Sequence, residues 1–192
     1  MRALEMKENT HNRIHPQIFA LWISMGSIVM LFAAWTSAYI VKQASGNWLE
    51  FSIPRIFFLS TVLIIASSVT LHFSYNAFKK GVEGTYKIML IATLLLAIGF
   101  ISCQYLGWSQ LFESGLDFKG NVSGSFFYLI TGGHAAHVLG GISAIIVAIL
   151  HAFALPFKFS EKRRHRFELV LQYWHFVDVL WIYLLIFLLI IK

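Results

Sequence analysis

The sequence predicts an all-α integral membrane protein, a bundle of five transmembrane helices whose N-terminus is cytoplasmic and whose C-terminus lies outside. Three observations support this fold class. The composition is 58% hydrophobic and only 12% charged, whereas soluble domains carry about 25% charged residues. Five long segments are almost free of charged residues, and the basic residues between these segments are unevenly distributed.

Each apolar segment has the length of one membrane crossing, which takes about 20 residues. We expect helices at about residues 17–41, 56–78, 88–112, 126–157 and 167–191. The apolar stretch of the fourth segment is too short for two crossings and a turn, so it holds one helix preceded by an outer loop. The sequence contains neither a repeat nor a long linker, so we expect residues 1–192 to form a single transmembrane domain.

The basic residues predict the orientation of the bundle. Eleven lysines and arginines lie in the N-terminal segment and in the loops after the second and fourth helices, and four lie in the remaining loops and at the C-terminus. Because the more basic loops stay in the cytoplasm, we expect the N-terminus inside and the C-terminus outside. This topology accounts for the formal charge of +6, so we expect no nucleic-acid partner.

The fourth helix carries a stripe of small side chains. This small-residue stripe consists of Gly132, Ala136, Gly140, Ala144 and Ala148, which recur at every fourth position. Membrane helices associate largely through close packing, and small residues permit it. We therefore expect this face to contact another helix, either within the bundle or on a partner protein.

The last two helices also carry polar residues that need partners inside the membrane. We define the polar seam as Glu168, Gln172, His175 and Asp178 on the last helix with His134 and His137 on the fourth. A charge at the bilayer centre costs at least about 2.5 kcal/mol, so these side chains are expected to face protein. We expect Asp178 to be buried against the fourth helix, hydrogen-bonded to His137 or His134, or otherwise to His175.

The polar seam has a structural and a chemical interpretation. Chains of acidic residues and histidines in membranes often mark proton relays, but this chain ends about halfway across the bilayer, which favours a structural contact. A haem on His137 and His151, or a metal on His134, His137 and Asp178, would require further ligands. We therefore expect no catalytic residue, metal site or cofactor site in this chain.

The loop before the last helix is strongly basic. It contains Lys158, Lys162, Arg163, Arg164 and Arg166. Its first interpretation is that it sets the membrane topology. A second interpretation is that these residues contact anionic lipid head groups, in which case the chain would bind a phospholipid.

Several motifs resemble one known family. The run YWHFVDVLW, from Tyr173 to Trp181, resembles the C-terminal signature of subunit III of the haem-copper oxidases, and Glu168 precedes it as in that family. Residues 131–141 (TGGHAAHVLGG) are similar to its glycine and histidine motif, and residues 66–70 (ASSVT) to its second-helix motif. The resemblance covers all five helices and is most specific in the last two. The mitochondrial form of the family has seven helices, and the five helices expected here make the chain similar to the bacterial members.

The resemblance implies an accessory, non-redox subunit of a proton-pumping terminal oxidase, a cytochrome c oxidase of aerobic respiration that reduces O₂ to water. It implies packing on the catalytic subunit I, contacts with subunits II and IV, with membrane lipids and with a respiratory supercomplex, and support of proton uptake and turnover stability. Haems and copper would lie in the partner subunits. The implied location is the bacterial inner membrane, with the C-terminus in the periplasm.

Two alternatives and one departure accompany this interpretation. Related subunits accompany nitric oxide reductase or quinol oxidase. An independent five-helix transporter would show paired interrupted helices or an inverted repeat, and the sequence shows neither. The family carries a carboxylate after a serine in the first helix, whereas here Ile28 follows Ser27 and that helix has no acid. A proton-linked role tied to that acid is therefore not implied for this chain.

Overall fold

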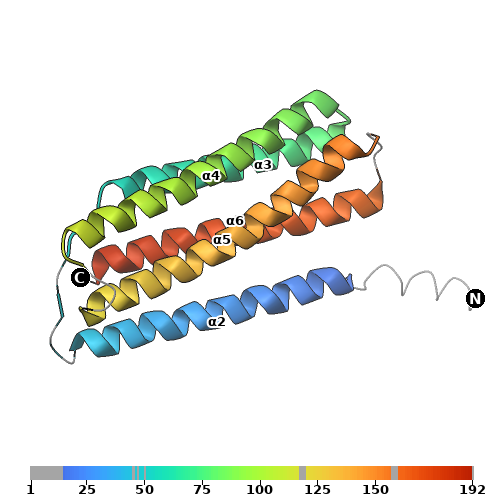
Figure 1. Ribbon diagram of the computed structural model, residues 1–192. Helices are drawn as coiled ribbons and strands as arrows, with labels where there is room; N and C mark the ends of the chain where they lie inside the picture. The colour runs from blue at the N-terminus through green and yellow to red at the C-terminus, as the bar shows by residue number, and fades with distance from the viewer. Residues whose placement is uncertain are drawn as a thin grey trace, which may run out of the picture.

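The computed structural model describes residues 15–44, 46, 48–49, 51–116, 120–156 and 160–191, and every regular element within these ranges is an α-helix. The helices are α2 (Pro16–Ala44), α3 (Ile56–Lys80), α4 (Glu83–Glu113), α5 (Val122–Ala154) and α6 (Glu161–Ile190). All five are long and apolar enough to cross a membrane. The prediction of an all-α protein with five spanning helices is therefore confirmed (Figure 1).

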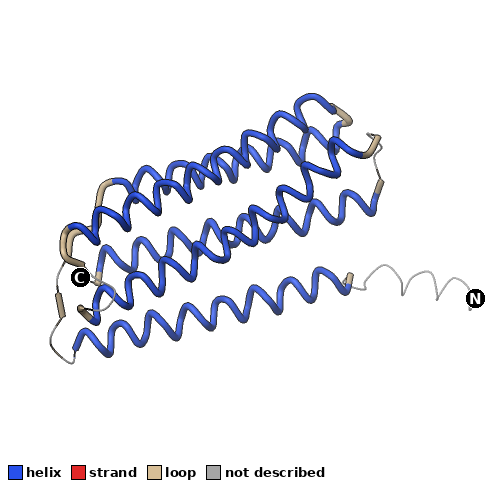
Figure 2. The backbone as a smooth tube through the Cα atoms, viewed as in Figure 1, coloured by secondary structure: helices blue, strands red, loops and turns tan. Residues whose placement is uncertain are grey.

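The helices lie roughly side by side in three layers (Figure 1). α3 and α4 form an antiparallel pair, α5 and α6 lie in the middle, and α2 lies on the opposite side. Loops at the two ends of the bundle join consecutive helices (Figure 2). α6 contacts α2, α3 and α5, whereas α2 contacts neither α3 nor α4 within the described ranges. α6 therefore occupies a central position and α2 a peripheral one.

Several helices extend beyond the apolar segments from which they were predicted. α4 begins at Glu83 and not near residue 88, and α6 begins at Glu161 and not near residue 167. Hydropathy marks only the part of a helix that lies in hydrocarbon, whereas helical hydrogen bonding continues into the interface, where charged side chains are solvated. α5 begins at Val122, where Asn121 Oδ1 accepts the Ser123 N–H at 3.0 Å and caps the helix.

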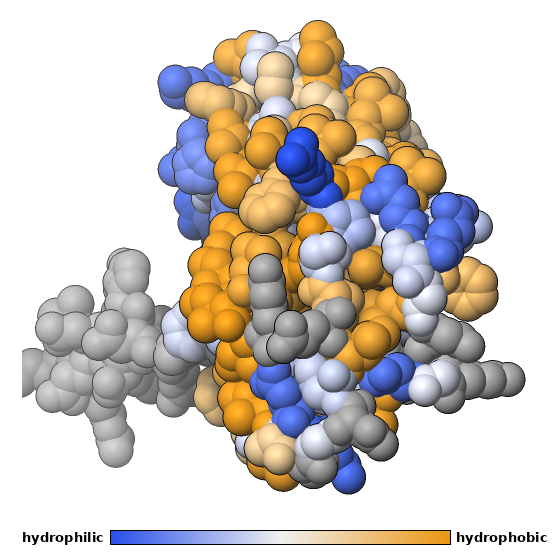
Figure 3. Space-filling view, turned by 90° about the vertical axis from the view of Figure 1, so that its left-hand side faces the viewer, coloured by the Kyte–Doolittle hydropathy of each residue, from blue (hydrophilic) through white to orange (hydrophobic). Residues whose placement is uncertain are grey.

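The burial of the helices follows their positions in the bundle. Half of the most apolar stretch of α6 is buried, against 6% in α2. The two tryptophans Trp174 and Trp181 of α6 are 1% and 0% exposed, which makes them the largest fully buried side chains of the core. Large apolar side chains remain exposed on every helix, and apolar residues cover much of the surface (Figure 3). Lipid would surround such a surface in a membrane.

Close packing of α5 against its neighbours falls beside the small-residue stripe and not on it. A Cβ atom added at Gly141 would lie 2.8 Å from the Trp174 ring, and one added at Gly133 would lie 2.4 Å from the Trp35 ring. By contrast, a Cβ at Gly132 would meet nothing within 4 Å, and one at Gly140 would meet only Tyr173 Oη at 3.6 Å. Gly140 is thus exposed, and Gly132 is half-buried beside a hollow that Tyr105, Trp108 and Tyr128 also line.

We predict that Gly141→Ala destabilises the protein while Gly140→Ala does not. The added methyl at Gly141 must displace the fully buried Trp174, and overpacking of this kind costs about 1–3 kcal/mol. Both changes improve helix propensity equally, so the neighbouring glycine is a matched control. The measurement is the melting temperature of the protein purified in mild detergent, and equal melting temperatures for the two variants would contradict the prediction.

Candidate functional site

The candidate site is the set of polar contacts that α6 makes with the helices around it. α3 and α6 run antiparallel (Figure 1), so residues early in α6 meet residues late in α3. Three side-chain hydrogen bonds join these helices: Tyr75 Oη to Glu168 Oε1 at 2.5 Å, Trp174 Nε1 to Ser67 Oγ at 3.0 Å, and Trp181 Nε1 to Thr61 Oγ1 at 2.9 Å. The indole N–H groups of Trp174 and Trp181 therefore both have acceptors, as buried tryptophans in apolar surroundings require.

A fourth contact between α3 and α6 involves His175. Its Nδ1 is hydrogen-bonded to the Ser68 hydroxyl, and its ring centroid lies 6.1 Å from that of His72. Ser68 belongs to the hydroxyl-rich stretch of α3 that also supplies Ser67, so one short segment forms hydrogen bonds with two consecutive residues of α6, Trp174 and His175.

His134 and His137 of α5 bind backbone carbonyls. His134 is fully buried, and its Nε2 lies 3.1 Å from the carbonyl oxygen of Val177 on α6. His137 Nδ1 lies 2.7 Å from the carbonyl oxygen of Gly133, one turn earlier in its own helix. Because a carbonyl can only accept a hydrogen bond, His134 must carry a proton on Nε2 and His137 must carry one on Nδ1. Tyr173 Oη of α6 in turn donates to the His137 carbonyl at 3.1 Å.

Asp178 lies in the interior but not in the predicted contact. Its side chain is 4% exposed, and neither carboxylate oxygen forms a well-aligned hydrogen bond among the described residues, although the Ser68 side chain lies close by. The predicted hydrogen bond to His137 or His134 is therefore wrong, because each imidazole donates to a carbonyl instead. The alternative partner, His175, is bound to Ser68.

The predicted stripe on α6 divides between two neighbouring helices. Glu168 and His175 face α3, whereas Gln172 Oε1 accepts the Trp22 Nε1–H of α2 at 3.2 Å. Two further contacts to α2, which the sequence did not reveal, lie toward the other end of α6: Thr36 Oγ1 with Tyr183 Oη at 3.2 Å, and Tyr39 Oη with the Ile191 carbonyl at 3.3 Å. Hydroxyl groups in an apolar run were the only sequence signal for them.

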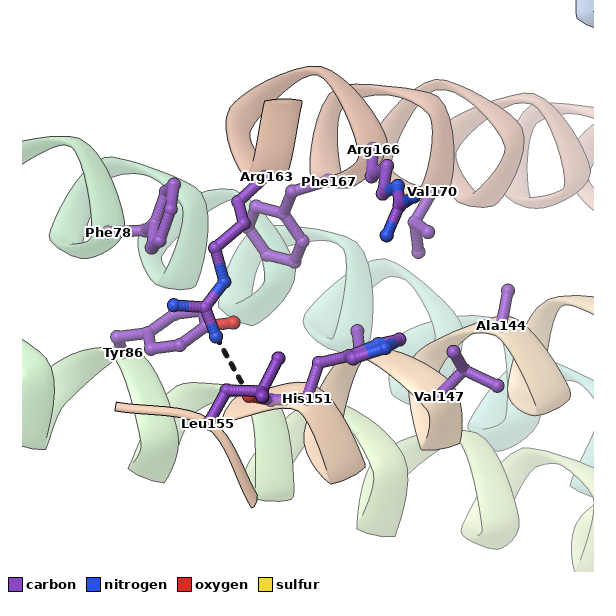
Figure 4. A pocket seen from close by; sticks show the side chains of 11 residues that line it. Phe78, Tyr86, Ala144, Val147, His151, Leu155, Arg163, Arg166, Phe167 and Val170 are labelled. Carbon is purple, nitrogen blue, oxygen red and sulfur yellow. Dashed lines mark hydrogen bonds between the residues drawn. The ribbon is translucent and has the colours of Figure 1, made fainter. Parts of the chain in front are cut away.

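The basic residues at the start of α6 have different surroundings. Arg164 forms ion pairs with Glu161 at 2.9 Å and Glu168 at 3.4 Å. Arg163 donates to the carbonyls of His151 and Pro156 at 3.0 and 2.9 Å. Arg163 and Arg166 also line a cavity of about 170 Å³ between the helices (Figure 4). Lys162 is exposed, and the predicted lipid contact Lys158 lies outside the described residues.

The chemistry that these contacts support is hydrogen bonding between helices. Within the described ranges, no three His, Cys, Asp or Glu side chains gather closely enough to hold a metal ion. The polar seam instead joins α6 to α2, α3 and α5 through one or more side-chain contacts to each helix.

Comparison with known proteins identifies relatives along nearly the whole chain. The family model described as cytochrome c oxidase subunit III matches residues 18–191. The chain is similar to cytochrome c oxidase subunit 3 of Corynebacterium diphtheriae, with 34% identity over 178 residues that cover 85% of each chain. It is 31% identical over 172 residues to the probable subunit 3 of Nocardia farcinica, covering 84% of this chain and 80% of the relative. The probable subunit 3 of Mycobacterium tuberculosis is 30% identical over 187 residues, or 89% of each chain.

We predict that Asp178→Val leaves the melting temperature of the detergent-purified protein equal to that of the parent or raises it. The change removes a buried carboxylate that forms no well-aligned hydrogen bond, and it leaves no histidine unpaired. Thr61→Val serves as the control, because it deprives the buried Trp181 N–H of its acceptor and should cost about 1–3 kcal/mol. If Asp178→Val destabilised the protein as much as the control while Asp178→Asn did not, Asp178 would have a hydrogen-bond donor after all.

Proposed function

The chain belongs to the cytochrome c oxidase subunit III family, and from that membership we propose how it acts within its oxidase. It is an accessory subunit of a haem-copper oxidase, a multi-pass protein of the bacterial membrane, and it associates with other oxidase subunits. We propose that it packs on the catalytic subunit I, sustains proton uptake and turnover stability, and binds no redox centre itself. The haems and copper then lie in partner subunits.

The observation that carries the proposed packing is the uncovered face of α5. Ala136 and Gly140 are exposed, and a Cβ at Gly132 would meet nothing within 4 Å. The polar side chains of α5 and α6 turn inward to one another and to their neighbours. A smooth face of small residues is the kind of surface on which a helix of another subunit can pack closely. We place the contact with subunit I there.

The polar seam supports a structural role and not a proton path within this chain. Its hydrogen bonds join α6 to a neighbouring helix or lie within α5, and His134 and His137 are each bound to a backbone carbonyl, which does not pass on a proton. α2 contains neither Asp nor Glu, so no acid of α2 takes part in proton uptake. We therefore propose that the chain aids proton uptake by holding subunit I in its active arrangement.

The remaining parts of the proposal concern orientation and partners. The uneven distribution of basic residues supports a cytoplasmic N-terminus and a periplasmic C-terminus. Subunits II and IV and a respiratory supercomplex are further proposed partners, with membrane lipids around the apolar surface. Family membership removes the independent five-helix transporter from consideration. Partners from a nitric oxide reductase or a quinol oxidase remain the alternatives that an experiment distinguishes.

We predict that Gly132→Leu reduces assembly with subunit I at least severalfold while leaving the chain itself folded. The leucine would project from the uncovered face of α5 and hold a partner helix away. Gly26→Leu on α2 is the matched control, since a Cβ at Gly26 also meets nothing within 4 Å. The measurement is the amount of subunit I, haem and copper recovered per tagged chain after purification in mild detergent, with the partners identified by mass spectrometry.

The same experiment distinguishes the alternatives. If the control blocked assembly and Gly132→Leu did not, the contact would lie on α2 and the proposed interface would be wrong. If the parent chain brought down the subunits of a nitric oxide reductase or a quinol oxidase, the proposed partner would be wrong. A haem spectrum in the isolated parent chain, stoichiometric with protein, would contradict the proposal that it binds no redox centre.

A further inference from the structure

His72 of α3 is a polar side chain on the outward surface of the bundle. It is exposed and lies beside the seam between α3 and α6, with its ring centroid 6.1 Å from that of His175. His175 Nδ1 is already hydrogen-bonded to Ser68. No hydrogen bond joins His72 to another of the described residues, so both of its ring nitrogens are open to a partner outside this chain.

The position of His72 along α3 places it well inside the membrane. The middle residue of α3 (Ile56–Lys80) is Ser68, and His72 lies one turn beyond it, about 6 Å along the helix axis. Hydrocarbon extends about 15 Å to either side of the bilayer centre, so with α3 centred in the bilayer His72 lies about 9 Å below the interface. An imidazole is too short to reach across this distance, unlike the long side chains of lysine and arginine.

Exposed serines of the spanning helices differ from His72, because they have acceptors within their own helices. Ser24, Ser102 and Ser143 each donate to the carbonyl oxygen one turn earlier, at 2.9, 3.0 and 2.8 Å. Such a serine can therefore face lipid at little cost. A histidine has both a donor and an acceptor to satisfy, and a side chain of this kind at this depth almost always faces protein. His72 thus marks a side of the bundle that another protein covers.

The surface around His72 is apolar and uncovered. We define the α3–α6 face as His72, Ile65 and Val69 of α3 with Val179 and Ile186 of α6, whose four aliphatic side chains are 44–65% exposed. α2 does not contact α3 within the described ranges, so it does not close this side. A transmembrane helix of another protein would supply apolar side chains for most of the face and one hydrogen-bonding side chain at His72. Lipid acyl chains would supply only the first.

We propose that the α3–α6 face receives a transmembrane helix of a second oxidase subunit, which places a hydrogen-bond-accepting side chain on His72. The proposal rests on the association of this family with other oxidase subunits. It adds a contact to the one proposed on α5. Because α3 does not contact α5 within the described ranges, the two faces lie on different helices that are not neighbours, and one partner helix cannot cover both.

The first test identifies what lies against the α3–α6 face. In the tagged full chain, the photo-crosslinking residue p-benzoylphenylalanine replaces Val69, which lies one turn from His72. The control carries it at Leu95 of α4, which is also an exposed aliphatic position of a spanning helix. After illumination of intact membranes, mass spectrometry sequences the crosslinked peptide. The Val69 position should give a spanning segment of one other oxidase subunit, with an oxygen-bearing side chain within one turn of the crosslink. The Leu95 position should not give that peptide.

The second test measures the contribution of the His72 side chain. His72→Leu should lower the recovery of the crosslinked subunit, after purification in mild detergent, roughly threefold to tenfold, as expected for the loss of one hydrogen bond between membrane helices. His72→Gln keeps a donor and an acceptor and should retain most of the partner. Ser102→Ala removes an exposed hydroxyl that is bonded within its own helix, so recovery should equal that of the parent.

A double-mutant cycle then assigns the partner group. Replacing the accepting side chain of the crosslinked segment with an apolar residue should cause the same loss as His72→Leu, and combining the two changes should cause no further loss. An unchanged melting temperature of the isolated His72→Leu chain shows that the variant is folded, because the change breaks no hydrogen bond to a described residue.

Three outcomes would overturn the proposal. One is a Val69 position that yields no protein adduct, which would make the face lipid-facing. Another is a crosslink to a second copy of this chain, which would identify self-association. The third is a His72→Leu variant that recovers its partners as the parent does. Loss of partners from Gly132→Leu but not from His72→Leu would leave the proposed contact on α5 standing and overturn only this one.

Discussion

The arrangement of the bundle depends on satisfying the polar side chains of α6 within a membrane. Hydrocarbon offers neither donors nor acceptors, so each polar group in a spanning helix must find its partner on protein. α6 carries more such groups than one neighbour could serve, and it contacts α2, α3 and α5. Its buried indoles and carboxylate oxygens find hydroxyl groups on α3, its glutamine meets an indole on α2, and one of its carbonyls accepts from a histidine of α5. The central position of α6 follows from this requirement.

The same requirement explains why one face of the bundle is left smooth. With the polar groups turned inward, α5 exposes the small residues Ala136 and Gly140 on one side. Such a face suits the proposed contact with the catalytic subunit. Asp178 is the exception, because its buried carboxylate forms no well-aligned hydrogen bond among the described residues. A buried polar group without a hydrogen bond costs stability. Within the polar seam, the only other such atom among the described residues is Nδ1 of His134.

Much of the fold could be predicted from the sequence, because spanning helices follow from hydropathy alone. Which residues share a helix face also follows from periodicity, but the rotation and depth of one helix against another do not. That is why Gln172 was grouped with His175 although the two side chains contact different helices. The histidines were expected to bind Asp178 but bind backbone carbonyls, whose availability no side-chain pattern records. The resemblance of the last two helices to subunit III, by contrast, rested on long contiguous motifs and agreed with the family match.

The most direct test of this account is the energy of the buried bond between Trp174 and Ser67, which joins α6 to α3 at the centre of the core. A double-mutant cycle with Trp174→Phe, Ser67→Ala and the combined variant isolates that energy from the packing changes of each substitution. Stability is measured by thermal unfolding of the purified protein in one detergent. The account predicts a coupling energy of about 0.5–1.5 kcal/mol. Strictly additive effects would contradict it, because the polar contacts of α6 would then contribute nothing to holding the bundle together.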